Sequence, residues 1–284
     1  MASMSWWLAM LLSLLTTMQS EELRGKKWES VPGPKKGQPI SIGGYAKGCV
    51  QGAEKLPLNG RGYQSMRPSR NRRFGHPHLI SYIEKYAKRI KRGGLGTMLV
   101  GDLGQARGGP SPSGHASHQS GLDVDIWFWR APVANQRKLT SKERETIGAP
   151  TFVDRKAKKI LKNWDRKMTK MLRLATLDNR VARIFVNPAV KRHICETTKN
   201  KSWLRKIRPW YAHHDHMHVR LECPESSPSC DAQRELPPGD GCDALDWWFR
   251  EKKKSERTKG KKTYSKKVRK KPLLPEACYD IFPS

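Results

Sequence analysis

The stretch SGHASHQSGLDVDIW, residues 113–127, places two histidines and two aspartates within eleven positions, from His115 to Asp125. A second stretch, YAHHDHMHVRL at residues 211–221, holds four more histidines. Six of the nine histidines of the chain therefore lie in these two windows. Imidazole and carboxylate groups gathered in this way are typical of a metal-binding or catalytic site.

Both stretches alternate apolar and polar residues, which is the pattern of a β-strand with one buried face. The first alternates from Leu122, so Asp123 and Asp125 share the face opposite the core. The second alternates from His216, so His216 and His218 point the same way. We therefore expect two strands that present carboxylate and imidazole away from the core.

His118, Asp125 and His218 form a ligand set that suits a divalent ion such as zinc. Three protein ligands leave the fourth position open for water, which is the arrangement of a catalytic rather than a structural zinc site. Zinc would bring the pKa of that water towards neutrality and polarise a bound carbonyl. A neighbouring imidazole that is not on the metal, most simply His216, would then move protons or stabilise an oxyanion.

The remaining periodicity mixes short strands with helices. The expected elements are helices over residues 79–90 and 155–177, strands over residues 96–104, 122–129, 181–188 and 216–223, and a helical turn over residues 190–195. This mixture predicts an α+β fold with a small central antiparallel sheet and flanking helices, which carries the zinc site. Residues 21–284 are expected to form a single domain.

The N-terminus favours export. Residues 6–18 are almost continuously apolar, and Glu21 and Glu22 follow them. This run is too short to span a bilayer with ease, and residues 1–20 fit a secretory signal peptide better than the alternative, an uncleaved anchor.

The chain has six cysteines, an even number that favours disulfides in an oxidising compartment when a signal peptide precedes them. They are Cys49, Cys195, Cys223, Cys230, Cys242 and Cys278. Six cysteines allow fifteen pairings, and their spacing does not choose among them.

The net charge is +30, and residues 250–271 supply much of it, with thirteen Lys or Arg and two Glu. This basic segment reads as a solvated run that binds polyanions without reading sequence. Export favours an anionic wall or membrane surface as its partner over a specific nucleic acid.

The two histidine-rich stretches closely resemble the penicillin-insensitive murein endopeptidases of Gram-negative bacteria, which belong to the wider group of lysostaphin-like, D-Ala-D-Ala-cleaving and hedgehog-related zinc folds. Further segments resemble blocks of the same family, in the same order. They are GGYAKGCVQGAEKLP (43–57), RFGHPHLI (73–80), GTMLVGDLG (96–104), ARIFVNPAVK (182–191) and GDGC (239–242).

The resemblance implies a role for each matched site residue. His118 and Asp125 match the family's H-x-x-G-x-x-x-D zinc motif, and His218 matches the second histidine of its H-x-H pair, the third ligand. His115 matches a histidine that is sometimes described as a metal ligand. His216, the first histidine of the pair, and His213 correspond to catalytic histidines beside the metal.

The implied reaction is hydrolysis of the D-alanyl–meso-diaminopimelyl crosslink of peptidoglycan in the periplasm. No serine nucleophile takes part, so penicillin has no group to acylate. Stem peptides carry free carboxylates, and Arg220 on the metal-side face is a candidate contact for one of them. A surface arginine without a substrate role is the alternative for this residue.

The family also has an Asp-x-x-His pair that is assigned to a further metal position. Counting back from Trp164 places Arg155 and Lys158 at these positions, and neither cation binds zinc readily. Asp154 would substitute only after a shift of one residue. We therefore expect one zinc site and do not carry over a second.

The resemblance further implies three disulfides that staple the loops. They are Cys49–Cys278, Cys195–Cys242 and Cys223–Cys230. Two alternatives to the endopeptidase function stay open. One is a D,D-carboxypeptidase or dipeptidase of the same fold group, and the other is a non-catalytic secreted protein that binds polyanions.

Overall fold

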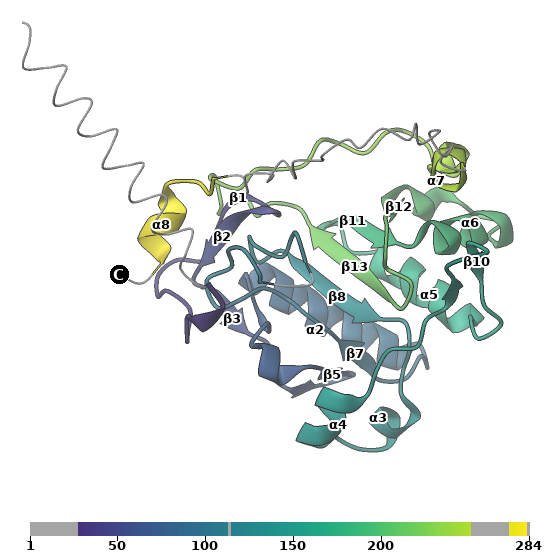
Figure 1. Cartoon of the computed structure of the whole chain (residues 1–284), viewed down its shortest axis with the longest axis horizontal. Coiled ribbons are helices and arrows are strands. Elements are labelled where there is room, and N and C mark those ends of the chain that lie inside the picture. Colours follow the sequence, from purple (N-terminus) through teal and green to yellow (C-terminus); the bar gives the residue numbers. More distant parts are fainter. Residues whose placement is uncertain (1–27, 113–114, 251–272, 283–284) are drawn as a thin grey trace, which may run out of the picture.

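The computed structural model describes residues 28–112, 115–250 and 273–282 (Figure 1). The predicted signal peptide, residues 1–20, lies outside these ranges, as does the basic segment except for Arg250. Within the described ranges, no helix has the length and apolar character needed to cross a membrane.

The chain forms short helices and strands around one large core. The α-helices are α2 (Pro77–Arg92), α3 (Pro132–Gln136), α4 (Ser141–Thr146), α5 (Arg166–Ala175), α6 (Pro188–Thr197), α7 (Asp246–Phe249) and α8 (Ala277–Ile281). The 3₁₀ helices are η1 (Trp28–Ser30), η2 (Pro68–Arg70), η3 (Ser202–Lys206) and η4 (Asp243–Leu245). The strands are β1 (Ile40–Gly44), β2 (Lys47–Gln51), β3 (Glu54–Lys55), β4 (Asn59–Gly60), β5 (Tyr63–Ser65), β6 (Phe74–Gly75), β7 (Met98–Val100), β8 (Asp123–Trp127), β9 (Val153–Asp154), β10 (Lys159–Ile160), β11 (Val181–Val186), β12 (Ile207–Pro209) and β13 (His216–Leu221).

A seven-stranded sheet organises the fold, in the order β12-β11-β13-β8-β7-β5-β4. Its centre, from β11 to β7, is antiparallel, as predicted. On either side of this centre the pairs β11–β12 and β5–β7 are parallel. The predicted α+β class is therefore confirmed, and the sheet places β8 next to β13 at its centre.

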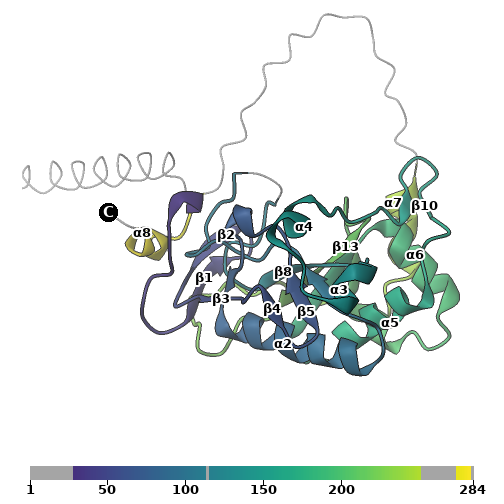
Figure 2. The same ribbon diagram turned by 90° about the horizontal axis from the view of Figure 1, so that it is seen from below.

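Helix α2 covers one face of this sheet (Figures 1 and 2). It begins where the His76 side chain accepts a hydrogen bond from the His78 backbone N–H, and it ends at Gly93. Its apolar side chains recur at helical spacing, and they pack in the same core cluster as the apolar face of β8 and β13. Burying one such side chain stabilises the fold by about 2 kcal/mol.

The predicted helix over residues 155–177 is wrong in its first half. Residues 153–160 form the β9–β10 hairpin, because the Asp154 carboxylate accepts hydrogen bonds from the backbone N–H groups of Lys156 and Ala157 and turns the chain. Helix α5 starts only at Arg166, where Asp165 caps it through the Met168 N–H. Aspartate is a favoured residue at the start of a helix, so Asp165 was a signal in the sequence for a helix that begins at Arg166.

The predicted helical turn over residues 190–195 is a full helix, α6. Asn187 caps it by accepting from the Ala189 N–H, and Pro188 occupies its first position. Strand β11 therefore ends at Val186, two residues before the predicted end.

The three implied disulfides are confirmed: Cys49–Cys278, Cys195–Cys242 and Cys223–Cys230. The first joins β2 to α8 and so ties the C-terminal helix to the start of the fold (Figure 1). The third closes a small loop just after β13.

Candidate metal centre

The paired strands β8 and β13 bring the two histidine-rich stretches together. Their antiparallel register sets His218 opposite Asp125, and Arg220 opposite Asp123. Residues directly opposite in such a pair project from the same face. The predicted alternation is confirmed, because Val124 of β8, with the apolar residues of β13, lies in the core on the other face.

The loop before β8 supplies two more histidines. His118 has a left-handed backbone, with φ of 68°, and its N–H donates to Asp123 Oδ2 at 2.9 Å. His118 Nε2 lies 3.5 Å from Asp125 Oδ1, and His115 Nε2 lies 3.4 Å from Asp125 Oδ2 and 3.1 Å from Asp102 Oδ2. One ligand atom each of His115, His118 and Asp125 lies within 4.8 Å of the other two, a spacing at which a metal ion can be held.

His218 adjoins this group from β13. Its Nδ1 lies 3.3 Å from Asp125 Oδ1, and its Nε2 lies 3.0 Å from Asp123 Oδ1. The ring centroids of His218 and His118 are 4.6 Å apart. The three predicted histidine ligands therefore surround Asp125: His115 and His118 in the tight group, and His218 beside it.

The polar atoms of this cluster fit a metal ion. Both ring nitrogens of His118, Asp125 Oδ1 and His218 Nε2 are buried, and among the described residues none has a partner in good hydrogen-bond geometry. A buried polar atom left in this state costs about 1–3 kcal/mol. Imidazole nitrogen with carboxylate oxygen is a donor set that zinc prefers.

The imidazole and carboxylate groups of the cluster shift one another's pKa values. Burial favours the protonated form of Asp125, but His118 and His216 outweigh it and hold the pKa of this carboxyl well below its usual range. Burial lowers the pKa of His218, as metal ligation by neutral imidazole requires. Burial also acts to lower the pKa of His118, but Asp125 outweighs it and raises that pKa. A metal cation at this position would compete with that proton.

The two predicted catalytic histidines lie beside the cluster. His216 Nδ1 is 2.5 Å from Asp215 Oδ1, and its Nε2 is 3.7 Å from Asp125 Oδ1. Burial would lower the pKa of His216, but Asp125 and Asp215 raise it. The His213 ring lies against the His216 ring in a tilted arrangement, with the centroids 5.0 Å apart, and its Nδ1–H donates to the Tyr211 carbonyl at 2.6 Å. Burial, helped by His216, lowers the pKa of His213 to about 3, so this ring stays neutral.

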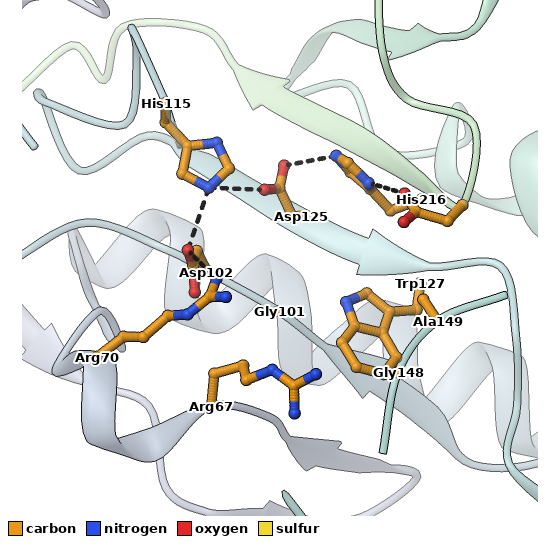
Figure 3. Close-up of a pocket in the computed structure, with 11 residues that line it drawn as sticks. Arg67, Arg70, Gly101, Asp102, His115, Asp125, Trp127, Gly148, Ala149 and His216 are labelled. Carbon is orange, nitrogen blue, oxygen red and sulfur yellow. Dashed lines mark hydrogen bonds and ion pairs between the residues drawn. The ribbon is translucent and has the colours of Figure 1, made fainter. Parts of the chain in front are cut away.

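A cavity of about 350 Å³ opens beside the cluster (Figure 3). Its lining includes His115, Asp125 and His216, together with residues that the sequence reasoning missed. These are Arg67, Arg70, Asp102, Trp127 and Asp215. The signal for Asp102 was a carboxylate at the end of a buried strand, and that for Asp215 was its place between two histidines.

Arg220 is not a surface residue, and it does not line this cavity. It is buried and forms a two-bond ion pair with Asp123. The hypothesis that Arg220 contacts a substrate carboxylate is therefore wrong. Its guanidinium instead holds Asp123, which in turn contacts His218 and the His118 backbone.

Two of the residues considered for a second metal position, Asp154 and Lys158, make other contacts in the structure. The Asp154 carboxylate accepts hydrogen bonds from the Lys156 and Ala157 N–H groups of its own loop. Lys158 reaches the Phe249 carbonyl at 3.5 Å. In the described ranges of the chain, the cluster of His115, His118 and Asp125 is the only group of three or more such ligands.

A histidine and aspartate cluster with unpartnered ligand atoms, set beside an open cavity on a β-sheet, is the arrangement of a metal-dependent hydrolase. The chain belongs to the penicillin-insensitive murein endopeptidase family, whose model matches residues 41–283. The family resemblance seen in the sequence is thereby confirmed.

Curated relatives carry the same name, penicillin-insensitive murein endopeptidase. The protein of Klebsiella pneumoniae (strain 342) is 41% identical over 271 residues, which is 94% of each chain. That of Pectobacterium atrosepticum is 42% identical over 94% of this chain and 92% of its own. That of Yersinia enterocolitica is 42% identical over 86% of this chain and 87% of its own.

Proposed function

We propose that the chain is a zinc-dependent murein endopeptidase that hydrolyses D-alanyl–meso-diaminopimelyl crosslinks in peptidoglycan. The observation that carries the proposal is the cluster of His115, His118 and Asp125 at an open cavity, in which the ring nitrogens of His118 and Asp125 Oδ1 have no hydrogen-bond partner among the described residues. It occurs in a member of a family whose name states this class of substrate and reaction.

His118, Asp125 and His218 are the proposed zinc ligands, with His115 beside them as a further ligand. When bound, zinc supplies an activated water at neutral pH and polarises the scissile carbonyl. Asp102 holds His115 by accepting from its Nε2, and Asp123 contacts His218, so both carboxylates orient rings of the ligand set.

His216 is the proposed acid–base residue. Asp215 accepts from its Nδ1, which fixes the tautomer and leaves Nε2 at the cavity. From there Nε2 can hold a proton beside the carbonyl oxygen and pass it to the leaving amine. His213 packs against His216 as a neutral ring, and we propose that it fixes the orientation of His216 and excludes water from its outer side.

Residues 1–20 are the proposed signal peptide, residues 21–284 the single mature domain, and the periplasm its location. Three disulfides in the structure support an oxidising compartment. We further propose that the basic segment, residues 250–271, contacts an anionic wall or membrane surface by charge alone. This contact would affect where the enzyme sits and not which bond it cuts.

A digest tests the proposed function. The mature protein is incubated with a soluble crosslinked muropeptide dimer, with and without a chelator or penicillin, and the products are separated by mass. We expect two monomers that together gain one water, loss of the reaction with chelator and no effect of penicillin. Release of only a terminal D-alanine would replace the proposal by the carboxypeptidase alternative. An intact dimer in the presence of bound zinc would favour the polyanion-binding alternative.

A further inference from the structure

The cavity is lined by two arginines on the side away from the histidines. In Figure 3, Arg67 and Arg70 lie across the cavity from the row formed by His115, Asp125 and His216. Two guanidinium groups therefore face the metal cluster over the space that a substrate would fill.

Arg67 is held in place by contacts from two separate parts of the fold. Its Nη1 donates to the backbone carbonyls of Arg144 and Glu145 at the end of α4. Its guanidinium also lies over the Trp127 ring of β8, 5.6 Å from the centroid. Arg67 precedes η2, and its backbone has φ of 55°, a left-handed conformation that is uncommon outside glycine. The group is thus fixed before any ligand arrives.

The positive charge of Arg67 has no opposite charge beside it in the described part of the chain. Arg70 and Arg72 both pair with Asp102, and Arg220 pairs with Asp123. Arg67 has no carboxylate within ion-pair distance among the described residues, and of its guanidinium nitrogens only Nη1 has hydrogen-bond partners there. Its Nε and Nη2 thus remain for another acceptor. Two adjacent N–H groups of a guanidinium match the two oxygens of a carboxylate.

Arg70 adds a second, weaker donor to the same side. One of its Nη atoms is 3.0 Å from Asp102 Oδ2, and half of its side chain is exposed. Its remaining N–H groups are open to a ligand in the cavity.

The crosslink that the proposed function assigns as substrate has a free carboxylate close to the scissile bond. In a D-alanyl–meso-diaminopimelyl bond, the carbon next to the scissile nitrogen bears a free carboxylate. When the scissile carbonyl lies at the metal cluster, this carboxylate lies one carbon beyond the nitrogen on the leaving-group side.

We propose that Arg67, assisted by Arg70, forms the subsite that binds the carboxylate next to the scissile nitrogen and so sets the specificity for an acidic leaving group. The inference rests on the proposed function and extends it. Arg67 is a specificity-determining residue that touches substrate, whereas the histidine cluster carries the chemistry.

Two matched substrates test the inference on the intact protein. One is the soluble crosslinked dimer with this carboxylate free, and the other is the same dimer with the carboxylate amidated. Hydrogen bonds to a charged group are worth enough to change affinity about ten- to a hundredfold. We expect the wild type to lose about that factor in kcat/KM on the amidated dimer, mostly through KM.

Variants then assign the effect to its residue. Arg67→Gln should lose a similar factor on the free dimer and little on the amidated one, so that its preference falls to near unity. Arg67→Lys keeps the positive charge but lacks the two adjacent N–H groups, so it should retain part of the preference for the free dimer over the amidated one. Arg70→Gln should reduce it less. Arg61→Gln removes the same charge at an exposed turn outside the cavity and should keep the full preference. Zinc content and unfolding temperature are measured for each variant.

The outcomes separate this inference from the proposed function. If the wild type cuts both dimers equally, or if Arg67→Gln loses activity equally on both, the subsite is overturned while the endopeptidase function stands. If the wild type cuts neither dimer, the proposed function fails and the subsite falls with it. If Arg67→Gln does not fold, the wild-type comparison of the two dimers and the Arg70→Gln variant still decide the matter.

Discussion

Arg220 and Asp123, on the neighbouring strands β13 and β8, form a buried ion pair next to the histidine cluster, on the same face of the sheet. Arg220 Nε lies 2.7 Å from Asp123 Oδ1, and Nη2 lies 3.2 Å from Oδ2. Asp123 is completely buried, and it contacts the His218 ring and the His118 backbone at the same time. The pair therefore links the stability of the sheet to the position of two proposed ligands.

Arg220→Met should leave the Asp123 charge buried and unpaired. We expect a loss of about 3–5 kcal/mol in the free energy of unfolding, measured by denaturant titration. Zinc affinity should fall about ten- to a hundredfold, because Asp123 no longer holds its partners in place. Arg183→Met removes a cation from the adjacent position of β11 and serves as the control. An equal loss in both variants would contradict the special role of the pair.

His218→Ala and His216→Ala should separate metal binding from chemistry. The first removes a proposed ligand, so zinc and activity should be lost together. The second should keep zinc and lower activity about 10²–10⁴-fold, the usual effect of removing a general acid–base group. Metal content after dialysis and turnover of the soluble dimer are measured side by side. Loss of zinc from His216→Ala would show that its role is wrongly assigned.

Deletion of residues 250–271 should leave turnover of the soluble dimer unchanged. Binding to whole sacculi should weaken, and the difference from wild type should disappear at high salt, because screening removes long-range attraction. Co-sedimentation at two ionic strengths measures the binding. A deletion variant that fails on the soluble dimer would place the segment in the active fold.

The disulfides should contribute unequally. The Cys49–Cys278 bridge joins residues 229 positions apart, and the Cys223–Cys230 bridge joins residues 7 apart. Loop entropy predicts losses of about 5 and about 2 kcal/mol for the two double alanine variants. Denaturant unfolding of both, under non-reducing conditions, compares them. Equal losses would mean that strain or residual structure dominates over chain entropy.

Buried Lys191 should make stability depend on alkaline pH. It donates to the carbonyls of Leu204 and Asp240, and burial, reinforced by Arg208, lowers its pKa from 10.5 to about 8. Between these values the unfolded chain binds more protons than the folded one, so stability rises with pH. From pH 8 to 10, wild type should gain about 2 kcal/mol relative to Lys191→Met. A constant difference between the two proteins would contradict the lowered pKa.

The sequence predicted the elements whose patterns are strong and local. Alternation in β8 and β13 assigned each face correctly, and the apolar spacing of α2 predicted that helix to within a few residues. The predicted helix over residues 155–177 was wrong at its start, because the hairpin there depends on the Asp154 side chain and not on periodicity.

The site was predictable only where its residues share a motif. His115, His118, Asp125, His216 and His218 lie in two short stretches, and one strand pairing brings them together. Arg67 and Asp102 reach the cavity from separate segments, through the β5–β7 and β7–β8 pairings and the loops that follow those strands. No spacing rule links them to a histidine. The alternating pattern of β13 placed Arg220 on the face of the sheet away from the core. The pattern does not show whether other parts of the fold cover that face, and in the structure Arg220 is buried.

The three disulfides are nested, and this order bears on how the protein is made. Cys223–Cys230 lies inside Cys195–Cys242, which lies inside Cys49–Cys278. An oxidant that joined cysteines in the order in which they leave a translocation pore would form Cys49–Cys195 and Cys242–Cys278, leaving only the innermost bridge correct. The native pairs then require exchange through mixed disulfides. If oxidation follows that order, the native protein requires thiol–disulfide isomerisation as well as oxidation.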